Sequence, residues 1–122
     1  MTLQKQTVGR RGERLAEDYL FALGAQLLER NFRVDYSEID LLLRHEDELI
    51  AVEVKTRAVE DLEAPEEAIR MSQLRRIVRG LVTYAQDHDM LEMPLRIDAV
   101  LIVIQPDGEV LRLEHLRSVY PA

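Results

Sequence analysis

The chain has 122 residues, of which 47% are hydrophobic and 32% are charged. This length suits one domain with a single buried core and is too short for two. There is no cysteine, which excludes a disulfide framework and a thiolate metal site. The formal net charge of −7 weighs against a strong non-specific nucleic-acid binder, because such proteins are usually basic.

Residues 1–11 lack the apolar core of a secretory signal. The longest apolar run, residues 99–104, is too short to cross a bilayer. A cytoplasmic location is therefore expected.

The first predicted element is a helix over residues 7–23, with Thr7 as its cap and Gly24 as its stop. Its apolar stripe consists of Leu15, Ala16, Tyr19, Leu20 and Leu23. Three strands are predicted next, over residues 25–34, 38–44 and 49–56. In the second strand, strict alternation places Ile39, Leu41 and Leu43 on one face.

A second helix is predicted to begin near Pro65, a favoured first-turn residue. Residues 95–104 are nearly all apolar and indicate a strand that is covered on both faces. After a turn at residues 106–108, residues 110–115 predict an edge strand. The order α-β-β-β-α-β-β predicts an α/β fold, with a central mixed sheet flanked by helices, in a single domain over residues 1–122.

The polar residues 45–48 predict a tight turn between the second and third strands. If this turn is centred between Glu46 and Asp47, residues whose numbers add up to 93 lie opposite each other. Asp40 then faces Glu53, and Glu38 faces Lys55. Because side chains alternate along a strand, all four would share one face.

Two opposed carboxylates repel each other unless a cation neutralises them. Asp40 and Glu53 together offer the oxygen ligands that a divalent metal such as Mg²⁺ or Mn²⁺ prefers. Such a metal could activate water and stabilise charge on a phosphate, with Lys55 supplying a positive charge beside it. The alternative is an exposed sheet face on which Lys55 and Arg57 merely balance the acids.

Residues 37–57, SEIDLLLRHEDELIAVEVKTR, resemble the signature of the YraN family of bacterial proteins. GRRGERLAEDYL at residues 9–20, RN at 30–31 and RIDAV at 96–100 extend the resemblance over most of the chain. The family is similar to PD-(D/E)xK nucleases, akin to Holliday-junction resolvases. The resemblance thus implies a restriction-endonuclease-like fold and a metal-dependent endonuclease that acts on DNA.

By position, the resemblance implies that Asp40 and Glu53 bind the metal, that Lys55 is catalytic and that Glu13 is a further metal ligand. Two departures stand out. The family usually has glycine where this chain has Ser37, and it commonly has lysine early in the second helix. Here that stretch reads Ser72-Gln73, followed by Arg75 and Arg76.

Arginines cluster at the start of the first predicted helix and along the second, and they are candidates for contacts with backbone phosphates. Each could equally belong to a solvated helix face. The candidates for nucleic-acid binding are Arg10, Arg11, Arg57, Arg75 and Arg76.

Asp98 lies in an apolar strand beside Arg96, which indicates a structural pair, because a buried acid needs a partner. The three histidines show no metal-ligand spacing. The acidic stretch at residues 60–67 is expected to be a mobile loop.

Two functions are compatible with these features. The first is a metal-dependent endonuclease acting on DNA, including branched or damaged DNA. The second is a non-catalytic module that keeps the nuclease-like fold and binds nucleic acid or a protein. Because nucleases of this kind often act as dimers, a homodimer is compatible with either, although no segment marks an interface.

Overall fold

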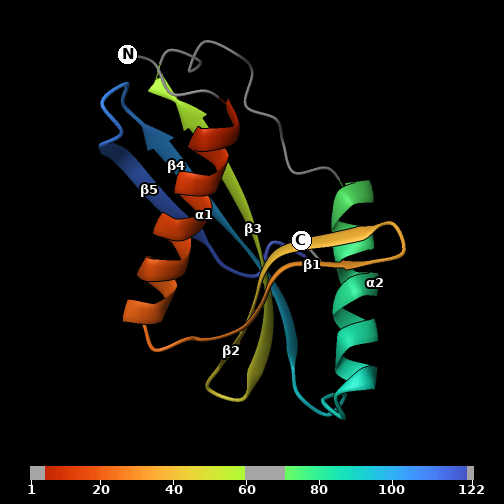
Figure 1. The fold of residues 1–122 in the computed structure, drawn as a ribbon. Helices are drawn as coiled ribbons and strands as arrows, with labels where there is room; N and C mark the ends of the chain where they lie inside the picture. Colours follow the sequence, from red (N-terminus) through yellow and green to blue (C-terminus); the bar gives the residue numbers. More distant parts are fainter. Residues whose placement is uncertain (1–4, 60–70, 121–122) are drawn as a thin grey trace.

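In a computed structural model, a five-stranded mixed sheet lies between two helices (Figure 1). The structure describes residues 5–59 and 71–120, with side chains from residue 8 onward. The elements are α1 (Lys5–Ala22), β1 (Gln26–Val34), β2 (Ser37–His45), β3 (Glu48–Ala58), α2 (Met71–Asp87), β4 (Leu95–Ile104) and β5 (Val110–Leu116). This confirms the predicted order.

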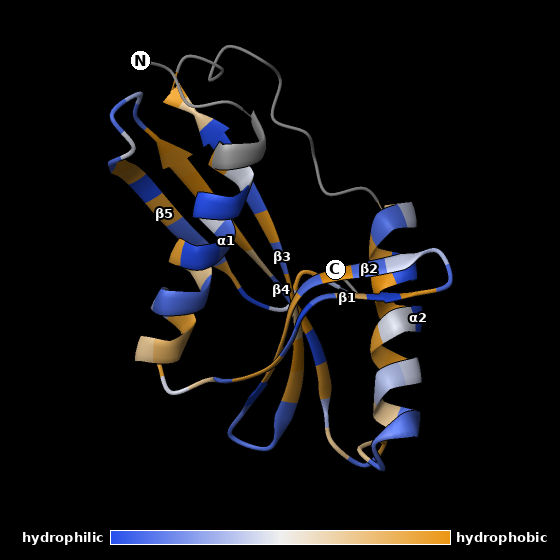
Figure 2. Ribbon diagram, viewed as in Figure 1, coloured by the Kyte–Doolittle hydropathy of each residue, from blue (hydrophilic) through white to orange (hydrophobic). Residues whose placement is uncertain are grey.

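The strands lie in the order β1-β2-β3-β4-β5, with β3 and β4 parallel and the other neighbours antiparallel. Strands β1 and β5 form the edges, so the edge position predicted for the last strand is confirmed. Helix α1 packs against one face of the sheet and α2 against the other. Hydrophobic colouring is concentrated in the central strands β3 and β4, while the helices carry both kinds of residue (Figure 2).

Helix α1 begins before Thr7, so the prediction that Thr7 caps it is wrong. Its end is as predicted. Gly24 has a φ of 97°, and the N–H of Ala25 donates to the carbonyl of Leu20 at 3.1 Å. A left-handed residue with this bond closes a helix, and glycine adopts it without strain. Helix α2 is described from Met71, so a start near Pro65 lies outside the described residues, as do the acidic residues 60–67.

The turn between β2 and β3 confirms the predicted register. Glu46 and Asp47 have φ values of 50° and 70°, which is typical of a tight hairpin turn. In every pair from His45–Glu48 to Leu41–Val52, the two residue numbers add up to 93, as predicted.

The predicted alternation along β2 is wrong at one point. Leu41 and Leu43 pack in the core beside α1, whereas Ile39 packs in the core beside α2. The side chains therefore change face at Asp40, where β2 stops pairing with β3. This break, rather than a regular strand, positions the candidate site.

The predicted pairing of Asp98 with Arg96 is confirmed, and Asp98 has more partners than predicted. Asp98 is 1% exposed and receives two hydrogen bonds from Arg96, at 2.9 and 3.0 Å. The backbone N–H of Ser118 and the ring of His115 also contact its carboxylate, at 3.0 and 2.8 Å. Tyr19 reaches His115 at 3.2 Å, which ties α1 to β5.

Among the described residues, no helix combines the length and the apolar character needed to cross a membrane.

Candidate active site

Asp40 lies where β2 leaves β3. The last regular pair of the two strands is Leu41 with Val52, so Asp40 is one position beyond the ladder. Its Oδ2 accepts a hydrogen bond from the backbone N–H of Val54 at 2.8 Å. The carboxylate thus takes the place of a backbone carbonyl and holds the strands together as they separate.

Glu53 approaches the same point from β3 and is 6% exposed. Its Oε1 accepts a hydrogen bond from Nε2 of Gln73 on α2 at 2.9 Å. The Nζ of Lys55 lies 3.4 Å from the same oxygen. Two polar groups from different elements therefore orient one buried carboxylate.

Asp40 raises the pKa of Glu53, whereas Glu53 lowers the pKa of Asp40. Burial and the negative charge of Asp40 raise the pKa of Glu53 to about 7, against the opposing effects of Lys55 and Gln73. Burial also raises the pKa of Asp40, and the charge of Glu38 adds to this, while the Val54 N–H and Lys55 oppose it. The carboxyl groups of Asp40 and Glu53 are therefore close enough to shift each other's pKa.

Glu13 reaches this cluster from α1. Burial raises its pKa, and the charges of Asp40 and Glu38 raise it further. A hydrogen bond from Asn31 and the charge of Arg10 act in the opposite direction. The negative charges of Asp40 and Glu38 therefore act on the carboxyl of Glu13 as well, although α1 packs on the opposite face of the sheet from α2.

Glu38 does not lie opposite Lys55, so that prediction is wrong. It pairs instead with Arg33 of β1, and the two side chains form an ion pair at 3.4 Å. The reason is the end of the β2–β3 ladder at Leu41, after which β2 pairs only with β1. Glu38 still contributes negative charge to Asp40 and Glu13.

The candidate arginines are placed differently from one another. Arg11 donates a hydrogen bond to the carbonyl of Gly108 at 2.6 Å, which ties α1 to the β4–β5 turn. Arg10 is exposed near Glu13. Arg57 is partly buried on β3, while Arg75 and Arg76 are exposed on α2.

Gln73 and Asn31 are the site residues that the sequence analysis misses. Both lie inside segments that it singles out, the Ser72-Gln73 departure and the RN pair. The signal for each is a polar side chain next to a predicted sheet, which does not reveal its partner. The contact of Gln73 with Glu53 joins residues that are 20 positions apart.

The donor set suits a hard divalent cation. Asp40 and Glu53 supply carboxylate oxygens, and a metal bound between them would offset the repulsion of their negative charges. Among residues 5–59 and 71–120, no group of three or more His, Asp or Glu side chains is already arranged as a metal site. The metal would therefore be held by the pair, with Glu13 nearby.

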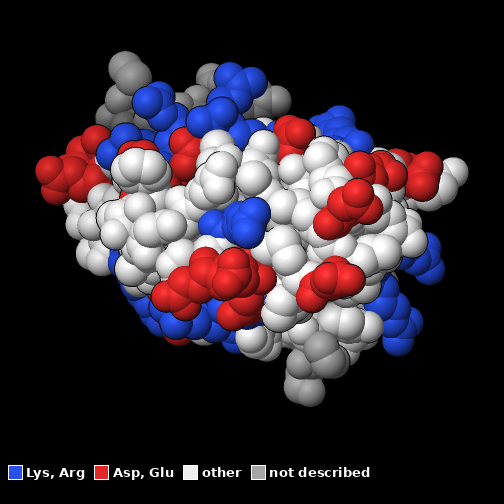
Figure 3. Space-filling view, turned by 90° about the horizontal axis from the view of Figure 1, so that it is seen from below, with Lys and Arg blue, Asp and Glu red and all other residues white. Residues whose placement is uncertain are grey.

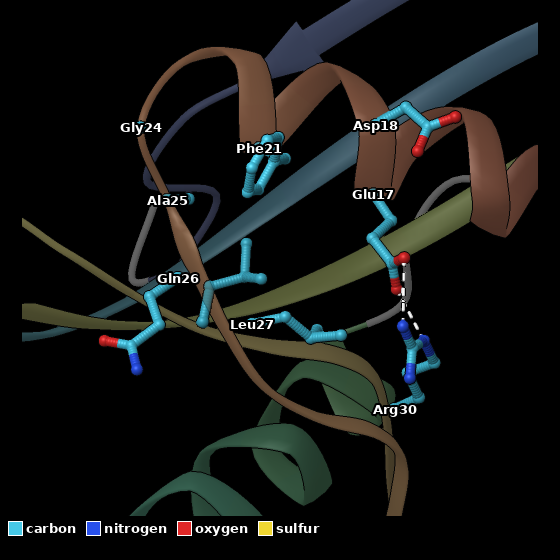
Figure 4. Close-up of a pocket in the computed structure, with 9 residues that line it drawn as sticks. Glu17, Asp18, Phe21, Gly24, Ala25, Gln26, Leu27 and Arg30 are labelled. Atoms are coloured by element: carbon cyan, nitrogen blue, oxygen red, sulfur yellow. Dashed lines mark hydrogen bonds and ion pairs between the residues drawn. The ribbon is translucent and has the colours of Figure 1, made fainter.

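A cavity of about 630 Å³ lies away from the candidate site, between the second half of α1 and β1. Glu17 and Arg30 face each other across it, joined by hydrogen bonds of 2.6 and 3.1 Å, and Phe21 stands at its side (Figure 4). The acids of the candidate site do not line this cavity: Glu13, Glu38, Asp40 and Glu53.

Several exposed acidic side chains lie away from Asp40 and Glu53. Figure 3 looks onto the end of the molecule with the β2–β3 turn and the last turn of α2, where several acidic side chains lie around a central basic one. Exposed acids at this end include Glu46, Asp47, Asp87 and Asp89. Because Glu53 is five residues along β3 from Glu48, it is roughly 16 Å from the turn.

Comparison with known proteins places the chain in a family. Residues 12–102 match the model of "Uncharacterised protein family UPF0102". The chain belongs to the UPF0102 family. A UPF0102 protein of Renibacterium salmoninarum is 40% identical over 94% of this chain and 97% of its own length. Another, from Dictyoglomus turgidum, is 33% identical over 97% of this chain and its own full length.

Membership of UPF0102, which is the YraN family, confirms the family to which the sequence motifs point. The segment that matches the UPF0102 model contains Glu13, Asp40, Glu53, Lys55 and Gln73, whereas Arg10 and Arg11 precede it. A UPF0102 protein of an Arthrobacter species is 38% identical over 94% of this chain and 97% of its own length. None of these names describes an activity, so the function has to be argued from the site.

Proposed function

We propose that this UPF0102 protein is a metal-dependent endonuclease that hydrolyses DNA phosphodiester bonds, with branched or damaged DNA as its substrate. The observation that carries the proposal is the buried carboxyl of Glu53, which lies within the electrostatic influence of Asp40 and has the Nζ of Lys55 beside it at 3.4 Å. Neighbouring carboxylates repel each other unless a cation neutralises them. A divalent metal between Asp40 and Glu53 would do so, and it could also bind the phosphate of the substrate.

Asp40 and Glu53 would hold Mg²⁺ or Mn²⁺, with Glu13 as a third acidic group. When bound, the metal would lower the pKa of a water molecule and stabilise negative charge on phosphate oxygens. The Val54 N–H fixes one oxygen of Asp40, and Gln73 fixes one oxygen of Glu53. Both carboxylates are therefore oriented before a ligand arrives, which reduces the cost of binding.

In the hydrolysis, a water oxygen forms a bond to phosphorus and the bond from phosphorus to the leaving oxygen breaks. The water loses one proton, and the leaving oxygen gains one. The ammonium of Lys55 carries a positive charge next to Glu53, where it can stabilise the extra negative charge of the phosphate in the transition state.

The test is cleavage by highly purified protein of duplex, single-stranded, flap and four-way junction DNA. We expect cleavage with Mg²⁺ or Mn²⁺, none with EDTA, and a loss of at least about 100-fold in Asp40→Asn and Glu53→Gln. The same preparation steps applied to both variants control for contaminating nucleases. Absence of cleavage on all four substrates would contradict the proposal.

The second candidate is a non-catalytic module with the same fold. The observation in its favour is that the described residues hold no ready-made group of three acidic or histidine ligands. Salt-dependent DNA binding without cleavage and without metal binding would favour this function.

A further inference from the structure

A small pocket lies between the β1–β2 turn and the middle of α2. Its volume is about 190 Å³, and Asp35, Tyr36 and Ser37 line it from the turn, while Arg76 and Arg79 line it from α2. Gly80 allows this approach, because a Cβ at that position would collide with the Ser37 side chain. The turn and the helix therefore form one continuous surface.

The pocket is positively charged. Arg76 and Arg79 are exposed, and neither forms an ion pair with any residue that the structure describes. Asp35 is the one acid in the lining, so two guanidinium groups stand against one carboxylate. Arginine forks match phosphate oxygens in shape and charge, which makes phosphate the anion that they suit best.

Tyr36 adds an aromatic surface at the rim. It is 93% exposed, the highest value among the exposed large hydrophobic residues of the described chain. Exposed aromatic rings beside arginines are a recurring means of stacking unpaired bases. A ring without any packing role therefore suggests a ligand that stacks on it.

We propose that this pocket holds one nucleotide of an unpaired DNA strand, with the phosphate between Arg76 and Arg79 and the base stacked on Tyr36. The volume agrees with a phosphate and part of a sugar, since sites that enclose whole small molecules usually measure about 300–1,000 Å³. The base then remains outside, where Tyr36 is. This inference rests on the proposed function and names its substrate class as DNA with unpaired nucleotides near the cut.

The pocket is close to the candidate active site. Gln73, which contacts Glu53, is three residues before Arg76 on α2, so the two occupy neighbouring positions on one side of the helix. One helical turn advances about 5.4 Å. A strand held in the pocket can therefore continue to the carboxylate pair within a few nucleotides.

Ser37 gives a second indication that this pocket binds a ligand. It is 6% exposed, and its Oγ has no hydrogen-bond partner among the described residues. A buried hydroxyl without a partner is unfavourable. A phosphate oxygen in the pocket would provide the missing acceptor after a small movement of the turn.

The chain has no tryptophan, so Tyr36→Trp introduces a single fluorescent reporter at an exposed position. We expect a 12-residue oligothymidylate, added in EDTA and low salt, to quench this fluorescence, while inorganic polyphosphate does not. Binding to Tyr36→Ala should be at least about fivefold weaker than to the wild type. An unchanged fluorescence at saturating oligonucleotide would overturn the inference.

The phosphate contact is tested by Arg76→Ala/Arg79→Ala, with Arg112→Ala as the matched control, since Arg112 is 64% exposed on the far edge strand. We expect the double variant to bind the oligothymidylate at least about tenfold more weakly than the wild type does. The slope of log K against log salt concentration should become shallower by about 0.7 for each phosphate contact that is lost. Asp35→Asn should tighten binding, because it removes the one opposing charge. Equal weakening by the double variant and the control would overturn the inference.

These measurements use no metal, so they are independent of cleavage. If binding behaves as expected and no DNA is cut, the pocket is retained and the endonuclease proposal fails. If DNA is cut, but the arginine double variant binds as Arg112→Ala does and the fluorescence of Tyr36→Trp is unchanged, the endonuclease proposal is retained and the pocket fails.

Discussion

The Asp40 carboxylate on β2 accepts a hydrogen bond from the backbone N–H of Val54 on β3 at 2.8 Å. This bond sits one position beyond the end of the β2–β3 ladder, where the side chains of β2 also change face. Because of that change, Glu13 from one face and Glu53 from the other can both approach Asp40. The opening between the strands is thus what gathers the acids.

The Val54 bond predicts a difference between two substitutions of Asp40. Asp40→Asn keeps an oxygen that can accept from Val54, whereas Asp40→Ala leaves that N–H without a partner. We expect Asp40→Ala to be less stable than Asp40→Asn by about 1–2 kcal/mol, measured by denaturant unfolding. Equal stability of the two variants would show that the bond contributes little.

Metal binding should stabilise the folded chain. A ligand at 100 times its dissociation constant adds about 2.7 kcal/mol to the free energy of unfolding, so Mn²⁺ should raise the melting temperature measurably. Glu53→Gln should lose this increase, and Glu114→Gln, on the edge strand β5, should keep it. A similar increase in both variants would place the metal elsewhere.

The raised pKa of Glu53 predicts a pH dependence in the metal-free protein. Because the folded pKa is about 7 and the ordinary value is 4.5, the folded state binds the proton more tightly than the unfolded state. Stability should therefore fall as pH rises from about 4.5 to about 7, by on the order of 2 kcal/mol. Glu53→Gln should flatten the unfolding free energy over this range, and a profile identical to that of the wild type would refute the assignment.

Gln73 should act as a positioning residue, because it touches Glu53 and not the substrate. We expect Gln73→Ala to weaken Mn²⁺ binding by about tenfold, measured by calorimetry, with the fold intact. Gln86→Ala, an exposed glutamine on the same helix, is the control. If both variants bind Mn²⁺ as the wild type does, the hydrogen bond has no role in the site.

The network around Asp98 should be structural. Burial disfavours its charge, but hydrogen bonds from Arg96, Ser118 and His115 hold the pKa of Asp98 below its ordinary value. This contribution is complete above a pH of about 3.8 and disappears as pH falls through the lower folded pKa. Asp98→Ala should lower the free energy of unfolding by about 3–5 kcal/mol at neutral pH, measured by denaturant unfolding. Asp87→Ala, at an exposed position, should change it little. Wild-type stability in Asp98→Ala would contradict this role.

Local sequence patterns were sufficient to predict the elements and the hairpin register. The turn at residues 45–48 sets which residues of β2 and β3 are paired, and Gly24 marks the end of α1. Burial of Asp98 within an apolar strand likewise predicts its partner Arg96. In each case the signal lies within a few residues of the feature.

The remaining features depend on contacts between distant segments. The end of the ladder at Leu41 moves Glu38 away from Lys55 and towards Arg33, and no alternation pattern marks that point. The contact of Gln73 with Glu53 depends on how α2 lies on the sheet. Both follow from tertiary packing, which overrides the local pattern.

The most direct test of a metal site between Asp40 and Glu53 is the anomalous scattering of a crystal soaked in Mn²⁺. We predict one strong anomalous peak in contact with carboxylate oxygens of Asp40 and Glu53, absent from Glu53→Gln crystals treated in the same way. A saturating soak that leaves no peak between these two residues, or that places the metal away from them, would contradict the account.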